Sequence, residues 1–489
     1  MKRFALLLLF ALPCLKAAPP NIIILLADDM AQQDLGVFGQ KEYATPHLDK
    51  LAREGCILSN AYAGAPVCAP SRATLLTGLH TGHARVRALG TRLKGQPAIL
   101  LKEDTTIAKV LHDTGYRTGV VGKWGLGSNN DEGHPLNLGF DSFYGFETHE
   151  QAHDFFPPFL TRDRVREPIP GNAGFDMKRL YRYDSDRSLP QVPKDFWPQY
   201  MADGALDLTG LGVKQPDQAR YSQDIIQEAA LRFINQPDPR PFFLYYATQI
   251  PHGPTVVKNL GEFKDKPWDI KHKVWAAMMK TLDDDVGELV AALEKSGKRG
   301  NTVIWFASDN GCEPGYLATH LDKDKRGDDP VFHNFGPGRG VKYTHYERGL
   351  RVSSFINAPG RIGPGICEQP TENYDLLPTF AAMAGTKLDS KTDGINLMPY
   401  LQGVTSDDRI LYWEDGANAK GTQAARTGKW FAFREGSGAA LQLYDLETDR
   451  ACSNDLAPKQ PEVVGRIDRF LKEQHAPSPW YPSKLDAAP

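Results

Sequence analysis

Four segments of this sequence share one pattern, an apolar and β-rich run that stops at polar residues. They are NIIILLADD, ending at Asp28 and Asp29; YRTGVVGKWG, ending at Lys123; PFFLYYATQIPHGP, ending near His252; and NTVIWFASDNG, ending at Asp309 and Asn310. Continuous apolar runs of this kind are typical of strands buried on both faces, as in a parallel sheet. This feature restricts the possible folds more than any other.

Helical segments lie between the predicted strands. Residues 105–114 are predicted to form a helix that ends at Gly115, and residues 273–295 carry apolar side chains at three- and four-residue intervals before Gly297. Alternating strands and helices predict an α/β fold, with a large, mixed but mostly parallel sheet sandwiched by helices. Ligands of such sheets gather beyond the carboxyl ends of the strands, so we expect the four polar clusters to share one site.

The character of the sequence changes along the chain. Residues 150–215 and 313–341 are rich in polar residues and proline with little periodicity, which predicts long ordered loops. The last part contains the short strand-like pieces RILYWED, KWFAFRE and LQLYDLETD, followed by a helix-like stretch at 463–474. We therefore predict a main domain at residues 19–403 and a small domain at residues 404–489, built from an antiparallel sheet and one helix.

The N-terminus has the pattern of a secretory signal peptide, predicted at residues 1–18. Lys2 and Arg3 precede an apolar run, and Ala17 and Ala18 follow it. The run is too short to span a bilayer and no later run is apolar enough, so we expect no membrane span and a periplasmic or secreted protein. The formal net charge of -3 gives no basic excess for binding nucleic acid.

Five cysteines remain after the predicted cleavage: Cys56, Cys68, Cys312, Cys367 and Cys452. An odd number leaves at least one without an intramolecular partner, and the spacing resembles neither a disulfide scaffold nor a zinc site. One disulfide among them stays open as a possibility. A free thiol in an exported protein needs another explanation.

Two strand ends carry oxygen ligands: Asp28 with Asp29, and Asp309 with Asn310. Three carboxylates gathered at one place would repel one another unless a cation neutralised them. Oxygen ligands without sulfur favour Ca²⁺ or Mg²⁺. Either pair alone would be typical of turn and cap residues. Two pairs at comparable strand ends favour a metal site.

Cationic side chains are expected at the same face. Lys123 and Lys342, with His252, would together form a socket for a small multivalent anion, although each lysine alone is typical of a solvated surface. A helix is predicted to begin about three residues after Cys68, with Arg72 in its first turn. Its start adds amide donors and a positive dipole end.

The stretch CAPSRATLLTG at residues 68–78 resembles the signature of the type I, formylglycine-dependent sulfatases: Cys-x-Pro-Ser-Arg followed by Leu-Thr-Gly. The resemblance extends through LLADDM, FASDNG, GVVGKWGLG, PHGP, GRGVKYTHYERGLRV and LYDLETD, which covers nearly the whole mature chain. It implies an alkaline-phosphatase-like fold and a sulfuric ester hydrolase of the arylsulfatase type. EGHP, GFDSFYGF and QAHDFFPPFL resemble a branch of secreted bacterial enzymes that act on sulfated sugars, and galactose or N-acetylgalactosamine sulfate is the first guess.

The resemblance also implies a role for each motif residue. Cys68 would be oxidised during export, by a formylglycine-generating enzyme, to Cα-formylglycine. One hydroxyl of the hydrated aldehyde attacks the sulfate sulfur, and the other allows sulfate to be expelled. By the same resemblance, Arg72 orients this residue, and Lys123 and Lys342 bind sulfate oxygens. His252 binds sulfate near the leaving oxygen and is the proton donor. One Ca²⁺ is bound by Asp28, Asp29, Asp309 and Asn310.

One position departs from the family pattern. The family often reads Lys-x-His at the first lysine, but here Gly125 follows Trp124. That histidine normally hydrogen-bonds the formylglycine hydrate and assists turnover. His134, His149 and His153 lie in the following loops and are candidates to replace it or to bind substrate. Each of them could equally be a loop or surface residue.

Two other functions remain open. The first is a phosphomonoesterase or phosphodiesterase on the related scaffold, but those enzymes usually use Ser or Thr with two transition metals and more histidine ligands. The second is a sulfoglycan-binding protein that has lost turnover, as Gly125 would allow. The intact signature at Cys68 argues against this reading.

Overall fold

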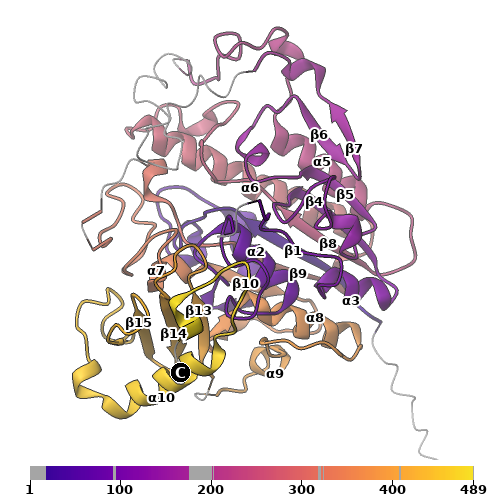
Figure 1. Ribbon diagram of the computed structural model, residues 1–489. Coiled ribbons are helices and arrows are strands. Elements are labelled where there is room, and N and C mark those ends of the chain that lie inside the picture. Colours follow the sequence, from indigo (N-terminus) through magenta and orange to yellow (C-terminus); the bar gives the residue numbers. More distant parts are fainter. Residues whose placement is uncertain are drawn as a thin grey trace, which may run out of the picture.

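A ten-stranded sheet forms the centre of the computed structural model (Figure 1), which describes residues 18–91, 95–175, 201, 203–317, 321–322, 324–406 and 409–487. The strand order is β11-β2-β10-β9-β1-β8-β4-β5-β6-β7. Its strands are β1 (Asn21–Ala27), β2 (Cys56–Leu58), β4 (Arg117–Lys123), β5 (Ser142–Phe146), β6 (Phe159–Arg162), β7 (Val165–Pro168), β8 (Phe242–Ala247), β9 (Thr302–Ser308), β10 (Ser354–Asn357) and β11 (Gly365–Cys367).

The middle of the sheet is parallel and its margins are mixed. β9, β1, β8, β4 and β5 run parallel, while β10 is antiparallel to both β9 and β2. β6 and β7 extend the other side as an antiparallel pair, and β11 lies parallel to β2. The prediction of a mixed, mostly parallel sheet is therefore confirmed.

Side chains of the central strands alternate between two apolar cores. In β1, Ile23 and Leu25 belong to one core, and Ile22 and Ile24 belong to the other. This alternation is what a strand buried on both faces requires. Helices α1 (Pro46–Arg53), α5 (Ser222–Ile234) and α6 (Ile270–Lys295) contribute to the first core, and α2 (Cys68–Thr77), α3 (Ile107–Asp113) and α8 (Leu376–Ala384) contribute to the second.

The last part of the chain forms a separate antiparallel sheet of four strands, coloured yellow in Figure 1. Its elements are β13 (Leu411–Glu414), β14 (Gln423–Thr427), β15 (Trp430–Arg434), β16 (Gln442–Asp445) and α10 (Pro461–Gln474). Ile467 and Leu471 of α10 cover one face of this sheet. The other face shares an apolar cluster with Tyr62, Leu350 and Tyr374 of the main part. The division into two domains at residue 403 stays a prediction.

Further short elements complete the fold. Strand β3 (Ala61–Tyr62) pairs with β12 (Thr371–Glu372). Two short helices are α7 (Glu347–Leu350) and α9 (Met398–Leu401). The 3-10 turns lie at Gly36–Phe38, Pro135–Asn137, Gln151–His153, Pro170–Asn172, Pro216–Gln218, Gly261–Phe263, Arg299–Asn301, Pro314–Leu317, Asn373–Asp375, Ala457–Lys459 and Lys484–Ala487.

Some predicted elements differ from the structure. Residues 150–215 were expected as loops, but they contain the β6–β7 hairpin, whose short, partly exposed strands have too few apolar residues to be recognised. Residues 176–200 and 202 of that stretch lie outside the described part, as do residues 1–17 of the predicted signal peptide. α6 begins three residues earlier than predicted, because the Asp269 side chain caps it by accepting from the Lys271 amide.

All five cysteines within the described residues are buried and free. The disulfide that the sequence left open is therefore not formed among them. None of the described helices combines the length and the apolar character needed to cross a membrane.

Trp413 connects the C-terminal sheet to the main part of the molecule. Its side chain is fully buried, and its Nε1 donates a hydrogen bond to the main-chain oxygen of Ala63 at 2.9 Å. We predict that Trp413→Ala lowers the free energy of unfolding by about 3–5 kcal/mol, the usual cost of truncating a buried tryptophan. Urea denaturation would measure it. Trp430→Ala, at a half-buried position of the same sheet, is the control. Equal losses for both variants would contradict this account.

Candidate active site

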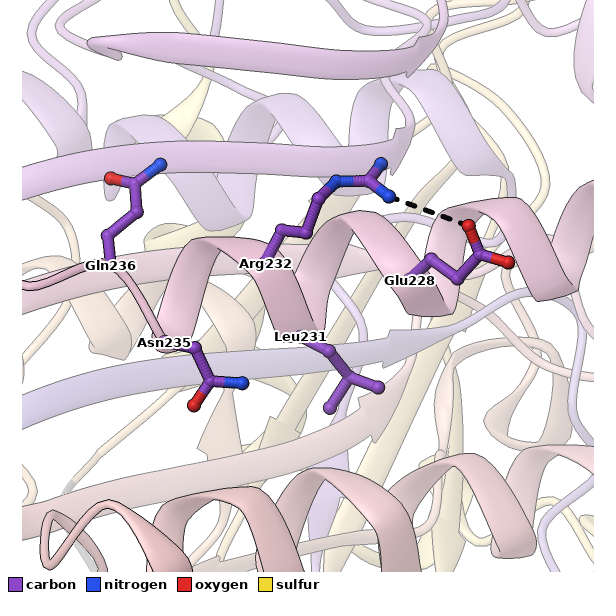
Figure 2. A pocket seen from close by; sticks show the side chains of 5 residues that line it. All are labelled: Glu228, Leu231, Arg232, Asn235 and Gln236. Carbon is purple, nitrogen blue, oxygen red and sulfur yellow. Dashed lines mark hydrogen bonds and ion pairs between the residues drawn. The ribbon is translucent and has the colours of Figure 1, made fainter.

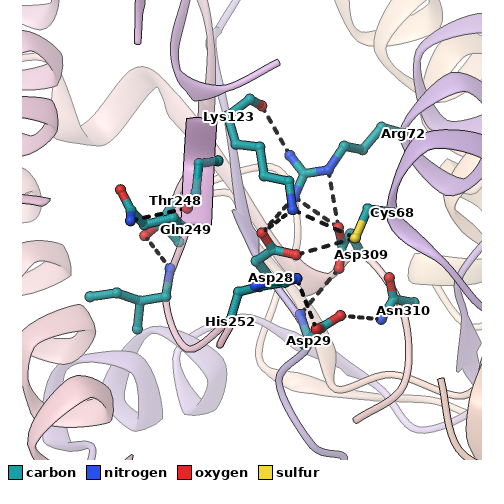
Figure 3. A network of polar contacts seen from close by, with 12 residues as sticks. Asp28, Asp29, Cys68, Arg72, Lys123, Thr248, Gln249, His252, Asp309 and Asn310 are labelled. Atoms are coloured by element: carbon teal, nitrogen blue, oxygen red, sulfur yellow. Dashed lines mark hydrogen bonds and ion pairs between the residues drawn. The ribbon is translucent and has the colours of Figure 1, made fainter. Parts of the chain in front are cut away.

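Four neighbouring parallel strands, in the order β9-β1-β8-β4, end at one edge of the sheet. The polar residues that follow them are thereby brought together from distant parts of the chain, as Figure 3 shows. Those residues are Asp28 and Asp29 after β1, Asp309 and Asn310 after β9, Lys123 at the end of β4, and His252 beyond β8, and all are buried.

Three carboxylates and one amide face one another in this cluster. The Asp29 amide donates to Oδ1 of Asp309 at 3.2 Å, and Nδ2 of Asn310 donates to Oδ1 of Asp29 at 2.6 Å. Consecutive strand residues would point to opposite faces of the sheet. Asp29 instead adopts a φ of 62°, a left-handed conformation that costs a non-glycine residue free energy. That turn lets Asp28 and Asp29 both reach the cluster.

Two lysines neutralise part of this charge. Nζ of Lys123 lies 2.5 Å from Oδ2 of Asp28, and Nζ of Lys342 lies 2.6 Å from Oδ2 of Asp29. Both ammonium groups are buried. The structure therefore places Lys342, which comes from a loop and not from a strand end, in the same cluster.

Arg72 donates hydrogen bonds to the cluster from helix α2. Its Nε and Nη2 donate to Oδ2 of Asp309 at 3.0 and 2.8 Å, and its Nη1 donates to the main-chain oxygen of Lys123 at 3.0 Å. Arg72 was expected to orient Cys68. The hydrogen bonds of this guanidinium fix Asp309 and the end of β4, and its Nη2 also lies 3.6 Å from Oδ2 of Asp28, the carboxylate beside Cys68. The role of Arg72 toward Cys68 stays a prediction.

The crowding of like charges shifts the pKa values of the carboxyl groups. Burial, together with the nearby Asp28 carboxylate, raises the pKa of Asp309 to about 7. Burial opposes ionisation of Asp28 too, but the Lys123 ammonium and the other nearby cations hold the pKa of Asp28 well below its usual value. Burial and crowding thus oppose ionisation of Asp309 even though Arg72 is paired with it.

The donor set fits a divalent cation. Oδ1 of Asn310 is buried without a hydrogen-bond partner, while its Nδ2 donates to Asp29 and to the main-chain oxygen of Gly311. An orphaned buried carbonyl oxygen costs free energy, and carboxylate and amide oxygens are the ligands that calcium and magnesium prefer. Asp28, Asp29, Asp309 and Asn310 are therefore the residues that could hold a metal ion.

Cys68 lies beside this cluster as the first residue of α2, three residues earlier than the predicted helix start. Its Sγ is 3.6 Å from Oδ1 of Asp28 and 3.6 Å from Nζ of Lys123. Burial raises the pKa of the thiol to about 12. The thiolate is the nucleophilic form of cysteine, so the unmodified side chain would be a poor nucleophile at neutral pH.

His252 faces Lys342 from the end of the β8 segment. Its Nδ1 lies 2.5 Å from the main-chain oxygen of Gly253 and donates to it, and its Nε2 lies 3.2 Å from Nζ of Lys342. Burial and the Lys342 charge lower the pKa of His252 to about 4. The imidazole is thus neutral here, and a role as proton donor requires Nε2 to gain a proton first.

The three candidate histidines occupy different surroundings. His134 is buried with both ring nitrogens used by the main chain: Nε2 donates to the oxygen of Asp163 and Nδ1 accepts from the amide of Leu136. This bonding explains His134 as a structural residue, away from the cluster. His153 stacks on His252 with ring centroids 4.5 Å apart, and the ring of His149 lies against Gly125.

Sequence reasoning missed Tyr316. Its hydroxyl donates to Oδ2 of Asp29 at 2.9 Å and lies 3.4 Å from Nε2 of His252. Tyr316 belongs to the stretch 313–341, which has no periodicity to direct attention to one residue. Its closeness in sequence to Asp309 was the available signal.

A hollow on the surface of α5 offers a much poorer site. It has a volume of about 610 Å³ and is lined by Glu228, Leu231, Arg232, Asn235 and Gln236 (Figure 2). Its charged groups are half exposed and pair with each other across one helical turn. None of the residues of the strand-end cluster lines this hollow.

Comparison with known proteins gives consistent results. A family profile described as Sulfatase matches residues 20–386. Arylsulfatase A of Homo sapiens is 31% identical over 504 aligned residues, which cover 96% of this chain and 86% of that protein. N-acetylgalactosamine-6-sulfatase of Rattus norvegicus is 31% identical over 441 residues, which cover 86% of this chain and 74% of that protein.

Solved structures share the fold. Ps i-CgsB aligns with a TM-score of 0.72 at 26% identity, covering 96% of each chain, and another of its structures is a complex with k-i-k-neocarrahexaose. A phosphonate monoester hydrolase of Agrobacterium radiobacter aligns with a TM-score of 0.61 at 18% identity, covering 94% of this chain and 96% of that one. The second likeness extends to the fold alone.

Arg72 offers a direct test of how the cluster is held together. A lysine has one ammonium and cannot replace the guanidinium that joins Asp309 to the main chain of Lys123. We predict that Arg72→Lys lowers the free energy of unfolding by about 1–3 kcal/mol, because lysine keeps the charge but leaves buried acceptors of Asp309 and Lys123 without hydrogen-bond partners. Urea denaturation would measure this loss. Arg232→Lys, at an exposed position of α5, serves as the control, and a loss as small as the control's would show that Arg72 does not hold the cluster.

Proposed function

The chain belongs to the sulfatase family and is a sulfuric ester hydrolase, and from this we propose that it removes sulfate from a sulfated carbohydrate with a nucleophile made from Cys68. The observation that carries the proposal is the position of Cys68. Its Sγ lies 3.6 Å from both Asp28 and Lys123, beside a cluster of buried cations and oxygen ligands.

Conversion of Cys68 to formylglycine would resolve a chemical difficulty of the site. The buried thiol has a pKa raised to about 12 and is a weak nucleophile. The hydrated aldehyde supplies a hydroxyl as nucleophile. Conversion requires a formylglycine-generating enzyme during export, so the proposal includes a periplasmic or secreted location and the signal peptide at residues 1–18.

We assign the metal site to Asp28, Asp29, Asp309 and Asn310, with one Ca²⁺ as the ion. The orphaned Oδ1 of Asn310 and the like-charged carboxylates support this assignment. Calcium accepts six to eight oxygen ligands with flexible geometry, which suits a cluster made of loop ends. The ion would supply positive charge for a sulfate oxygen.

Lys123, Lys342 and His252 are assigned to the sulfate group itself. The two lysines are held at fixed positions by Asp28 and Asp29, so their charges are pre-organised for the anion and need no rearrangement. His252, next to Lys342, is the candidate for contact with the leaving oxygen. A sugar hydroxyl is a poor leaving group, which makes protonation at this oxygen important.

A carbohydrate substrate is supported by the relatives. One of them is an N-acetylgalactosamine-6-sulfatase, and one solved structure of similar fold holds a neocarrahexaose. We therefore propose galactose or N-acetylgalactosamine sulfate as the first substrates to test. Phosphate esters belong in the same panel, because the phosphonate monoester hydrolase shares the fold. Turnover of phosphate esters alone would overturn the proposal.

The proposed nucleophile can be tested by removing it. We predict that Cys68→Ala lowers the rate of sulfate release more than about 1,000-fold, since covalent catalysis is lost, while the fold is retained because only one side-chain atom is removed. Sulfate release from the sulfated-sugar panel and thermal unfolding are measured together. Cys312→Ala, another buried free cysteine, is the matched control. Parental activity of Cys68→Ala would refute the assigned nucleophile.

The metal assignment can be tested by depletion. We predict that dialysis against a calcium chelator lowers activity at least about tenfold, because the site then lacks the ion that would supply positive charge to a sulfate oxygen. Added Ca²⁺ should restore the rate. Full activity of protein shown by elemental analysis to be free of metal would remove this cluster from the mechanism.

A further inference from the structure

The side chain of His149 is half-buried, and its two ring nitrogens are buried without a hydrogen-bond partner among the described residues. It lies three residues beyond the end of β5, and neither Nδ1 nor Nε2 has a hydrogen-bond partner although both atoms are inaccessible to solvent. A buried polar atom without a partner costs about 1–3 kcal/mol. Two such atoms on one ring indicate that their hydrogen-bond partners are groups bound in the working site.

The imidazole occupies the volume beside Gly125. A β-carbon built on Gly125 would lie 2.3 Å from Cε1, 2.4 Å from Nε2 and 2.8 Å from Nδ1 of His149. Hydrogen bonds from the Trp124 amide to Phe146 and from the Gly125 amide to Glu147, at 3.0 and 3.1 Å, fix the two segments side by side. A side chain at residue 125 would therefore displace the His149 ring, and the φ of 74° at Gly125 also favours glycine there.

The His149 ring packs against Gly125, two residues beyond Lys123, and so lies next to the end of β4 that faces the cluster. Apart from burial, the groups that lower its pKa well below the usual value are the cations Lys123, Arg72 and Lys342. Lys123 is also 3.6 Å from Sγ of Cys68. A neutral imidazole has one N–H donor and one acceptor nitrogen, so it can accept a proton from a hydroxyl in this pocket.

We propose that His149 is a catalytic residue that accepts the proton of the hydroxyl carried by residue 68 when sulfate leaves. The inference rests on the proposed conversion of Cys68. His149 takes the proton from the hydroxyl oxygen that is not bonded to sulfur. The O–H electron pair closes the carbonyl bond, and the bond from that carbon to the sulfate oxygen breaks with its pair on the departing sulfate. The proton then passes from His149 to water.

A simpler account of the orphaned nitrogens is a water molecule that bonds to both. Such a water would give His149 a structural role only. The two accounts differ in what happens after the first turnover. Loss of a proton acceptor for sulfate release slows the second half of the reaction and leaves the first half intact, whereas loss of a structural residue lowers both.

The test compares His149→Gln and His149→Ala with the parent chain and with His112→Gln, an exposed control on α3. In both His149 variants we expect kcat to fall at least about 100-fold, the usual effect of losing an acid–base group. The first turnover should release alcohol at near the parental rate, as a burst of one equivalent per converted site. His112→Gln should behave like the parent.

The second readout is the mass of the peptide that contains residue 68, measured after acid quenching in excess substrate. The His149 variants should retain one SO₃ group on this peptide, and the parent and control should not. An unchanged kcat, or a fall in the first turnover equal to that in kcat with no retained SO₃, would overturn the inference. Parent chain that lacks the converted residue, or releases no sulfate, would instead contradict the proposed function.

Discussion

Three carboxylates buried at one edge of the sheet, those of Asp28, Asp29 and Asp309, determine how the rest of this site is built. They repel one another, and burial makes each charge more costly. Lys123 pairs with Asp28 and Lys342 with Asp29, while Arg72 pairs with Asp309 and lies within ion-pair distance of Asp28. The crowded carboxylate oxygens and the orphaned amide oxygen of Asn310 are the ligands that a divalent ion would use. Neutralisation by fixed cations leaves the pocket pre-organised for an anion.

The main sheet and this cluster were predictable because they follow from local patterns. Buried parallel strands leave long apolar runs, and polar residues directly after them must meet at the same edge. Features that depend on contacts distant in sequence were not predictable. The β6–β7 hairpin has short edge strands without a strong pattern, Tyr316 comes from an aperiodic loop, and the partners of Arg72 could be identified only once Asp309 was in place.

The position of His149 is related to the departure from the family pattern at Gly125. Sequence alone gave three candidates to compensate for Gly125. The structure separates them, since His134 is saturated by main-chain hydrogen bonds, His153 stacks on His252, and the ring of His149 fills the space that a side chain at residue 125 would need. A side chain at residue 125 and the ring of His149 would compete for one space, which no local pattern could reveal.

The most direct test of the account is an experimental structure of the exported protein, purified from cells that possess the converting enzyme and crystallised with calcium. The account predicts formylglycine or its hydrate at residue 68, and one ion whose ligands are oxygens of Asp28, Asp29, Asp309 and Asn310 at about 2.3–2.6 Å. An unmodified thiol at residue 68, with no ion among these four residues in millimolar calcium, would contradict it.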